Sequence, residues 1–175
     1  MATRKKSKQV QGLKPRTAKL QLKAGADGDC RISKKALKLV IPHVEKIITT
    51  LSNSVSALLD IANKKKVTKQ FLLAAIKMNS SFHCQRRLTS AVESAYEAQN
   101  KGDRQQVSVA SGVRLFKQGL RSDQIISADA KVAVAQIMQV TLRNIGHDAF
   151  VIAENADRMT IQSRDIKTVF QVRTY

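Results

Sequence analysis

VEKIITTLSNSVSALLDIA, residues 44–62, is the stretch that decides the fold, because its apolar residues return at alternating steps of four and three. This spacing places them on one face of an α-helix. It is also the a and d spacing of helices that pack along their length. The stretch therefore predicts a long helix that packs against another long helix. The residues on this face are Val44, Ile48, Leu51, Val55, Leu58 and Ala62.

A second copy of this apolar face lies 94 residues further along the chain. The same shift superposes Ser33 on Ser127 with no gap. Because a repeat at a fixed spacing marks repeated structural units, we expect two units of the same design. Each should contain a long helix of roughly 28–30 residues, near 45 Å at 1.5 Å per residue. The residues of the second face are Met138, Leu142, Ile145, Ala149, Ile152 and Ala156.

The segments that flank each long helix follow the same repeat. Ser33 and Ser127 stand where an N-cap belongs, since a serine hydroxyl can accept a hydrogen bond from an unpaired amide of the first turn. Neither copy can bury its apolar face alone, so we expect the two long helices to cross antiparallel. Short helices are expected at 16–25, 69–78, 110–119 and 163–172, with a further amphipathic helix between the copies.

The composition favours a polyanionic partner. The chain has 31 Lys and Arg against 13 Asp and Glu, a formal net charge of +18, and its first 26 residues contain no acid. Dense positive charge on a folded chain is typical of proteins that bind nucleic acid. No apolar run approaches the roughly 20 residues of a membrane span, and no secretory signal is visible. We therefore expect a soluble, intracellular protein without a membrane or small-molecule partner.

Catalytic and metal-binding chemistry is not indicated. Cys30 and Cys84 have no CxxC or histidine-rich spacing, and His43 and His147 have no partner at ligand spacing. No base or oxyanion site accompanies either thiol. The sequence thus predicts neither an enzyme, nor a cofactor, nor a metal site.

The second copy carries a motif of three polar residues at fixed spacing after its long helix. Arg158 ends the long helix, Thr160 follows two residues later, and Asp165 stands in the first turn of the last helix. A helix–loop–long helix–loop–helix unit of this size with this motif resembles the histone fold. The resemblance implies that Arg158 and Asp165 form a structural clamp and that Thr160 contacts the DNA backbone. It also implies an all-α fold, in which two histone folds in one chain form an intramolecular handshake dimer with an extra helix between them.

The resemblance divides the chain into five parts. The expected boundaries are a basic disordered arm at 1–15, a first histone fold at 16–79, its additional C-terminal helix at 80–102, a linker at 103–108 and a second histone fold at 109–175.

Two histone folds in one chain resemble the histone doublets of large DNA viruses. The segment ISKKA, residues 32–36, and the extra helix are similar to a 2B-type core histone, and RLFKQG, residues 114–119, to a 2A-type. NIGHDAFVIAENADRMT, residues 144–160, is also close to the type-four pattern, and the carboxylates of a 2A-type acidic surface are missing. The expected location is then a virion, a viral factory or the host nucleus.

The two copies depart from the histone pattern in different places. In the first copy Lys64 and Phe71 stand at the clamp positions, so that loop is basic but not clamped. In the second copy the loop arginine, which the first copy keeps as Arg31, is replaced by Gln124 or Ile125. We expect one end of the dimer to be clamped and the other end only charged.

The resemblance implies double-stranded DNA and other histone-fold chains, such as a complementary doublet, as partners. The expected function is binding, bending and compaction of DNA without sequence preference in nucleosome-like particles. The alternative is a histone-fold subunit of a transcription or replication complex that docks proteins. The residues expected to contact DNA are Arg16, Lys19, Arg31, Lys34, Lys35, Lys64, Lys65, Lys66, Arg114, Lys117, Arg121, Arg158 and Thr160.

Overall fold

A computed structural model describes residues 12–26, 29–79, 85–95 and 107–172. Tyr96 and the rest of the linker, His83, Cys84, and the arm before Gly12 lie outside these ranges. The elements are α1 (Pro15–Gly25), β1 (Arg31–Ile32), α2 (Lys34–Ile61), β2 (Lys66–Val67), α3 (Lys69–Met78), α4 (Gln85–Glu93), α6 (Val109–Phe116), the 3-10 helix η1 (Lys117–Gly119), β3 (Ile125–Ile126), α7 (Ala128–Glu154), β4 (Thr160–Ile161) and α8 (Ser163–Val172).

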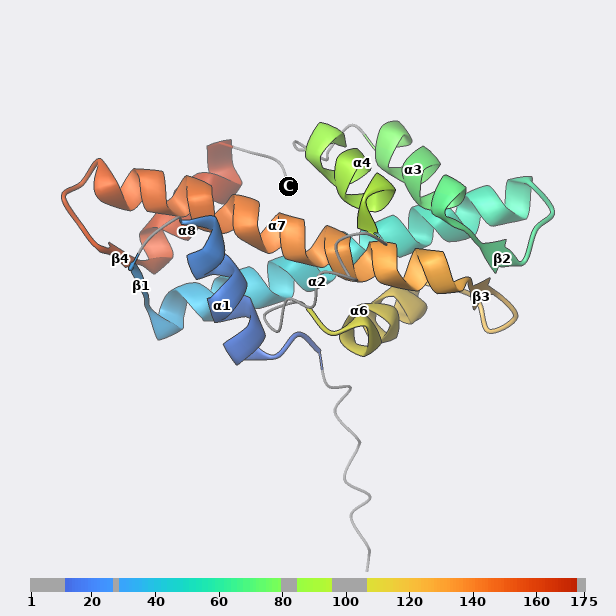
Figure 1. Cartoon of the computed structure of the whole chain (residues 1–175), viewed down its shortest axis with the longest axis horizontal. Coiled ribbons are helices and arrows are strands. Elements are labelled where there is room, and N and C mark those ends of the chain that lie inside the picture. Colours follow the sequence, from blue (N-terminus) through green and yellow to red (C-terminus); the bar gives the residue numbers. More distant parts are fainter. Residues whose placement is uncertain (1–11, 27–28, 80–84, 96–106, 173–175) are drawn as a thin grey trace, which may run out of the picture.

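The two long helices, α2 and α7, cross each other antiparallel along the length of the molecule (Figure 1). Their apolar faces meet, as the repeated spacing predicts. The buried residues on these faces are Val44, Ile48, Leu51 and Val55 of α2 and Met138, Leu142, Ile145 and Ala149 of α7. The predicted all-α fold with two paired units is confirmed.

The predicted apolar face is wrong near the end of each long helix. Leu58 and Ile152 are only partly buried at the edge of the core, and Leu59 and Ala153 take the central positions. Ala62 and Ala156 are exposed. The steps of four and three average 3.5 residues, whereas a straight α-helix has 3.6 per turn, so the stripe drifts by about 20° every seven residues. After two such periods the stripe has turned by about 40°, so Leu58 and Leu59 lie on either side of the line that faces the partner helix. Ala62 and Ala156 lie beyond the last residues of α2 and α7, Ile61 and Glu154.

The N-caps of the long helices differ between the copies. At α2 the hydroxyl of Ser33 accepts from the amide of Ala36 at 3.1 Å. At α7 Ser127 is the N-cap residue as predicted, but its hydroxyl donates to the carboxylate of Asp129 and caps no amide. An acid in the first turn, which α7 has and α2 lacks, competes for the hydroxyl and itself interacts favourably with the positive end of the helix dipole.

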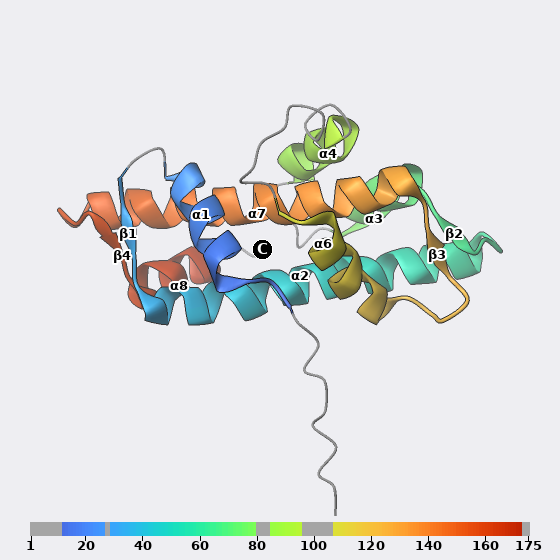
Figure 2. The ribbon, with the colours of Figure 1, turned by 60° about the horizontal axis from the view of Figure 1, so that its bottom comes forward.

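Short parallel strand pairs join the loops of one unit to those of the other. β1 pairs with β4, with Arg31 opposite Thr160, and β2 pairs with β3, with Lys66 opposite Ile125. The two pairs lie at opposite ends of the molecule (Figure 2). Each end is therefore built from the loop before one long helix and the loop after the other.

The helices α1 and α6 cross the α2–α7 pair on the same face of the molecule (Figures 1 and 2). α1 approaches α7 backbone to backbone, because a Cβ on Gly146 would stand 2.8 Å from the Cα of Leu22. Gly25 sits equally close to the backbone of Arg143. At the position related by the repeat, Ser52 of α2 donates to the carbonyl of Phe116 instead.

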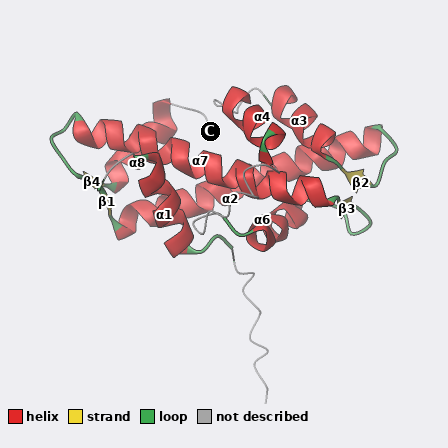
Figure 3. Cartoon of the chain, viewed as in Figure 1, coloured by secondary structure: helices red, strands yellow, loops and turns green. Residues whose placement is uncertain are grey.

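The extra helix α4 packs on α3 and on α7 (Figure 3). Leu88, Val92 and Ala95 are buried, and Arg87 donates to the side chain of Asn144 at 2.8 Å. α7 is consequently covered by α1, α4, α6 and α8 as well as by α2. Within the described residues, no helix is both long enough and apolar enough to span a membrane.

Candidate nucleic-acid interface

At one end of the molecule, β1 and β4 present Arg31 beside Thr160; we call this the clamped end. The amide of Arg31 donates to the carbonyl of Met159 at 2.8 Å, and that of Ser33 to Ile161 at 3.1 Å. Arg31 is exposed, whereas Ile32, the next residue on the strand, is buried. The pairing of the two strands thus directs a guanidinium outward next to a threonine.

A bidentate ion pair between Arg158 and Asp165 holds the loop behind this strand pair. The two guanidinium nitrogens donate to the two carboxylate oxygens at 2.7 and 2.9 Å. Arg158 also donates to the carbonyl of Thr160 at 3.2 Å, and Asp165 accepts from the amide of Gln162 at 2.7 Å. The Asp165 side chain is 1% exposed. Arg158 is therefore turned toward the protein, and it positions Thr160 rather than presenting its own charge to solvent.

Burial alone would raise the pKa of Asp165, but the hydrogen bonds from Arg158 and from the backbone of Gln162 outweigh burial and lower the pKa below its ordinary value of 3.8. The same hydrogen bond to Asp165 raises the pKa of Arg158. Both shifts favour the charged pair in the folded state.

We expect the clamp to make stability dependent on pH in the acid range. A carboxyl whose pKa is lower in the folded than in the unfolded state stabilises the fold above its unfolded pKa, and this contribution is lost as pH falls through the folded pKa. The free energy of unfolding should therefore fall below about pH 4 more steeply in the wild type than in Asp165→Asn. Urea titrations between neutral and acidic pH measure both slopes. Parallel slopes would contradict a charged clamp.

At the opposite end, β2 and β3 place Lys66 beside Ile125; we call this the open end. The 94-residue repeat relates Ile125 to Arg31 and Lys66 to Thr160. The register thus settles which residue replaces the loop arginine: it is Ile125, and its side chain is 60% exposed. Gln124 points inward instead.

Gln124 joins the open end to α2. Its side-chain oxygen accepts from the hydroxyl of Ser56 at 2.9 Å and from the amide of Arg121 at 3.1 Å. Its side-chain nitrogen lies 3.5 Å from the carboxylate of Asp60. This buried network has no counterpart in the clamp motif and was not predicted, although a glutamine among exposed loop residues was a weak sign of it.

Two of the cations at the open end form exposed ion pairs with carboxylates. Arg121 contacts Asp60 at 2.5 Å, and Lys65 contacts Asp123 at 3.3 Å. Among the described residues no ion pair is found for Lys64 or Lys66. The sequence predicted these four cations as DNA contacts but not the two carboxylates that hold two of them.

Between the two ends, α1, α6 and η1 carry four predicted cations, Arg16, Lys19, Arg114 and Lys117, and two more, Lys34 and Lys35, stand in the first turn of α2. α1 starts against α2, where the amide of Leu13 donates to the carboxylate of Glu45 at 2.8 Å. Pro15 at its first position has no amide hydrogen to leave unpaired, and the other backbone amides of the first turn can donate to an anion. Of the thirteen residues predicted to contact DNA, only Arg158 and Thr160 are not fully exposed. The exposed ones are Arg16, Lys19, Arg31, Lys34, Lys35, Lys64, Lys65, Lys66, Arg114, Lys117 and Arg121.

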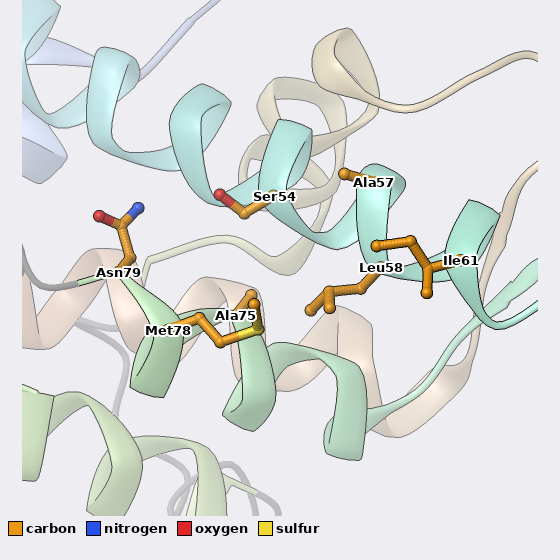
Figure 4. A pocket seen from close by; sticks show the side chains of 7 residues that line it. All are labelled: Ser54, Ala57, Leu58, Ile61, Ala75, Met78 and Asn79. Carbon is orange, nitrogen blue, oxygen red and sulfur yellow. The ribbon is translucent and has the colours of Figure 1, made fainter.

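Two apolar grooves lie on the surface, each between a long helix and the short helix that follows it. The first, about 380 Å³, is lined by residues of α2 and α3, among them Ile61 and Met78, which are 83% and 71% exposed (Figure 4). The second, about 370 Å³, is lined by residues of α7 and α8, including Val172. The repeat relates Met78 to Val172, so the two grooves are equivalent parts of the two units.

Two of the side chains that could support other chemistry, those of Cys30 and His43, are enclosed by the protein. Cys30 is fully buried, and burial raises the pKa of its thiol. The ring of His43 stacks on that of Phe170 at 3.8 Å between centroids, and burial lowers its pKa. The described part of the chain holds no group of His, Cys, Asp and Glu side chains that could bind a metal ion.

Paired helical units with exposed cations at their loops define a structural, DNA-associated class of protein, and the comparisons with known proteins agree. The model of the core histone H2A/H2B/H3/H4 domain matches residues 85–172, half of the chain. The chain belongs to this core histone family, which packages DNA and is not enzymatic. Its general function is therefore DNA binding of the chromatin type.

A solved structure supports the fold across both units. The crystal structure of the histone from Methanopyrus kandleri is similar with a TM-score of 0.67 and 17% sequence identity. The match covers 93% of this chain and 95% of that chain. No curated protein sequence matches.

Proposed function

We propose that this chain is a histone doublet that binds, bends and compacts double-stranded DNA without sequence preference. In this proposal the first unit is of the 2B type and the second of the 2A type, and the doublet assembles with a complementary doublet into nucleosome-like particles. The likeness of two fused folds to viral doublets extends the proposal to a viral genome, packaged in a virion, a viral factory or the host nucleus.

The observation that carries the proposal is the pairing of loops between the two units. Each strand pair joins residues far apart in the chain, Arg31 to Thr160 and Lys66 to Ile125, and so fixes the two units as one body. Covalent linkage raises the effective concentration of the partner unit and fixes a ratio of one to one. A single chain then supplies the whole DNA-contacting surface of a histone pair.

The charge on that surface favours the phosphate backbone over the bases. The exposed predicted contacts are lysines and arginines, which neutralise phosphates and release counterions. Contacts of this kind set position and affinity but carry no sequence information. Binding should accordingly weaken steeply with salt on any sequence.

The two apolar grooves support other histone-fold chains as partners. Exposed apolar patches of this kind are typical of interaction sites, and each groove is built from the same two helices of its unit. We propose that a second histone-fold chain docks here through its own helix pair. The position of α4, which follows the first unit and covers α7, supports the 2B assignment.

Nuclease digestion tests the packaging function. Mixed with a complementary histone doublet and random-sequence DNA, the chain should protect a discrete length of duplex, irrespective of sequence. An Ile61→Glu variant, which charges one groove without touching a DNA contact, should shorten the protected length while leaving binding of short duplexes intact. A smear, or protection of a single sequence motif, would instead support a docking subunit of a transcription or replication complex.

A further inference from the structure

The two ends of the proposed DNA path differ in whether their cations are bound to carboxylates. At the clamped end Arg31 and the two lysines that follow β1, Lys34 and Lys35, are exposed, and within the described residues none of the three makes an ion pair. At the open end the related position is Ile125, and two of the four nearby cations are already bound to carboxylates. The same surface therefore offers free charge at one end and partly neutralised charge at the other.

The ion pairs at the open end are exposed enough to exchange partners. The side chains of Lys65 and Asp123 are 75% and 53% exposed, and those of Arg121 and Asp60 are 64% and 35% exposed. Ion pairs between side chains of this exposure contribute little to stability, because water and salt screen them. A phosphate can displace either carboxylate, but the displaced carboxylate stays close to the DNA and repels it.

We propose that Asp60 and Asp123 are built-in competitors of phosphate for Arg121 and Lys65, so that the open end of the DNA path binds more weakly and releases DNA first. The inference rests on the proposed DNA-binding function and adds a direction to it. DNA leaves from the end formed by β2 and β3 while the end formed by β1 and β4 stays bound.

A double-mutant cycle on Lys65 and Asp123 tests the competition. In the wild type, Lys65→Ala should lower the affinity for a short random duplex by less than about twofold, because Asp123 already holds much of that charge. In an Asp123→Asn background the same change should cost about fivefold or more, within the range of coupling between contacting residues. It should also lower the salt slope by about one. Fluorescence anisotropy at several salt concentrations measures both quantities.

The matching cycle on Arg121 and Asp60 should show coupling of the same sign. Asp60→Asn keeps a side-chain oxygen near Gln124 and removes a negative charge from the last turn of α2, where it opposes the helix dipole. The fold should therefore survive, which thermal unfolding checks.

The control is Asp157→Asn at the clamped end. Asp157 and Asn63 are related by the repeat, and both have a φ of 53°, so the substitution installs the residue of the other unit. It should raise affinity less than Asp123→Asn. Equal gains, or no coupling in either cycle, would overturn the inference while leaving DNA binding intact. A wild-type chain that binds no DNA would overturn the proposed function itself.

Discussion

A Gly146→Val variant should have a free energy of unfolding about 2–3 kcal/mol lower than the wild type, the upper part of the range for overpacking. A Cβ at this position of α7 would stand 2.8 Å from the Cα of Leu22 and closer still to its carbonyl oxygen. These are backbone atoms of α1, so no rotamer change can relieve the clash. α1 must move away from α7, and the apolar residues between the two helices must separate.

Urea unfolding followed by circular dichroism measures this effect, and Gly112→Ala is the matched control. Gly112 also lies in a helix at an interface, but a Cβ there would meet its nearest atoms at 3.3–3.4 Å, a tight contact that small shifts relieve. Alanine also has the higher helix propensity by about 1 kcal/mol, so the control should be close to neutral. Equal stability of Gly146→Val and wild type would mean that α1 does not rest on α7 as described.

An Asp165→Ala variant should lose about 3 kcal/mol of folding free energy, because breaking a buried pair leaves the other partner uncompensated. Arg158 would lose its bidentate acceptor, and the amide of Gln162 would lose its hydrogen bond. Thermal unfolding at neutral pH measures the loss. DNA affinity at a temperature where both proteins are folded should also fall, since Thr160 loses its support.

Asp123→Ala at the open end is the control that separates the effect of burial from the effect of losing an ion pair. Asp123 also pairs with a cation, but both side chains are more than half exposed, so its removal should cost at most about 0.5 kcal/mol. Similar losses in the two variants would show that the clamp does not stabilise the fold more than a surface ion pair does.

The sequence predicted the helices well because their signals are local. Apolar spacing alone located both long helices, and residues 69–78 and 163–172 are α3 and α8 with the predicted bounds. The prediction failed in details that the apolar spacing does not determine. Leu58 lies at the edge of the core because the apolar stripe drifts around α2, and the hydroxyl of Ser127 is taken by Asp129 of the same helix.

The contacts of the candidate site could be predicted only where both residues belong to one motif. A motif with fixed spacing links Arg158 to Asp165, so their contact was readable from the chain. The contacts of Asp60 with Arg121 and of Ser56 with Gln124 join residues more than 60 positions apart and belong to no motif. Gly146 gave no sign that α1 rests on it, because a glycine inside a helix pattern shows nothing of its neighbours.

The strand pairs also determine when the protein can fold during its synthesis. Arg31 has no partner until Thr160 has been made, a delay of about 6–26 s at about 5–20 residues per second. Until α7 has been made, the part of the apolar face of α2 that packs on α7 has no partner, although α1 and α3 already contact α2. Because the two units are fused, one ribosome makes both of the faces that pack together. The exposed face of α2 is therefore covered after a fixed time, and this does not depend on meeting a separately made partner at low concentration.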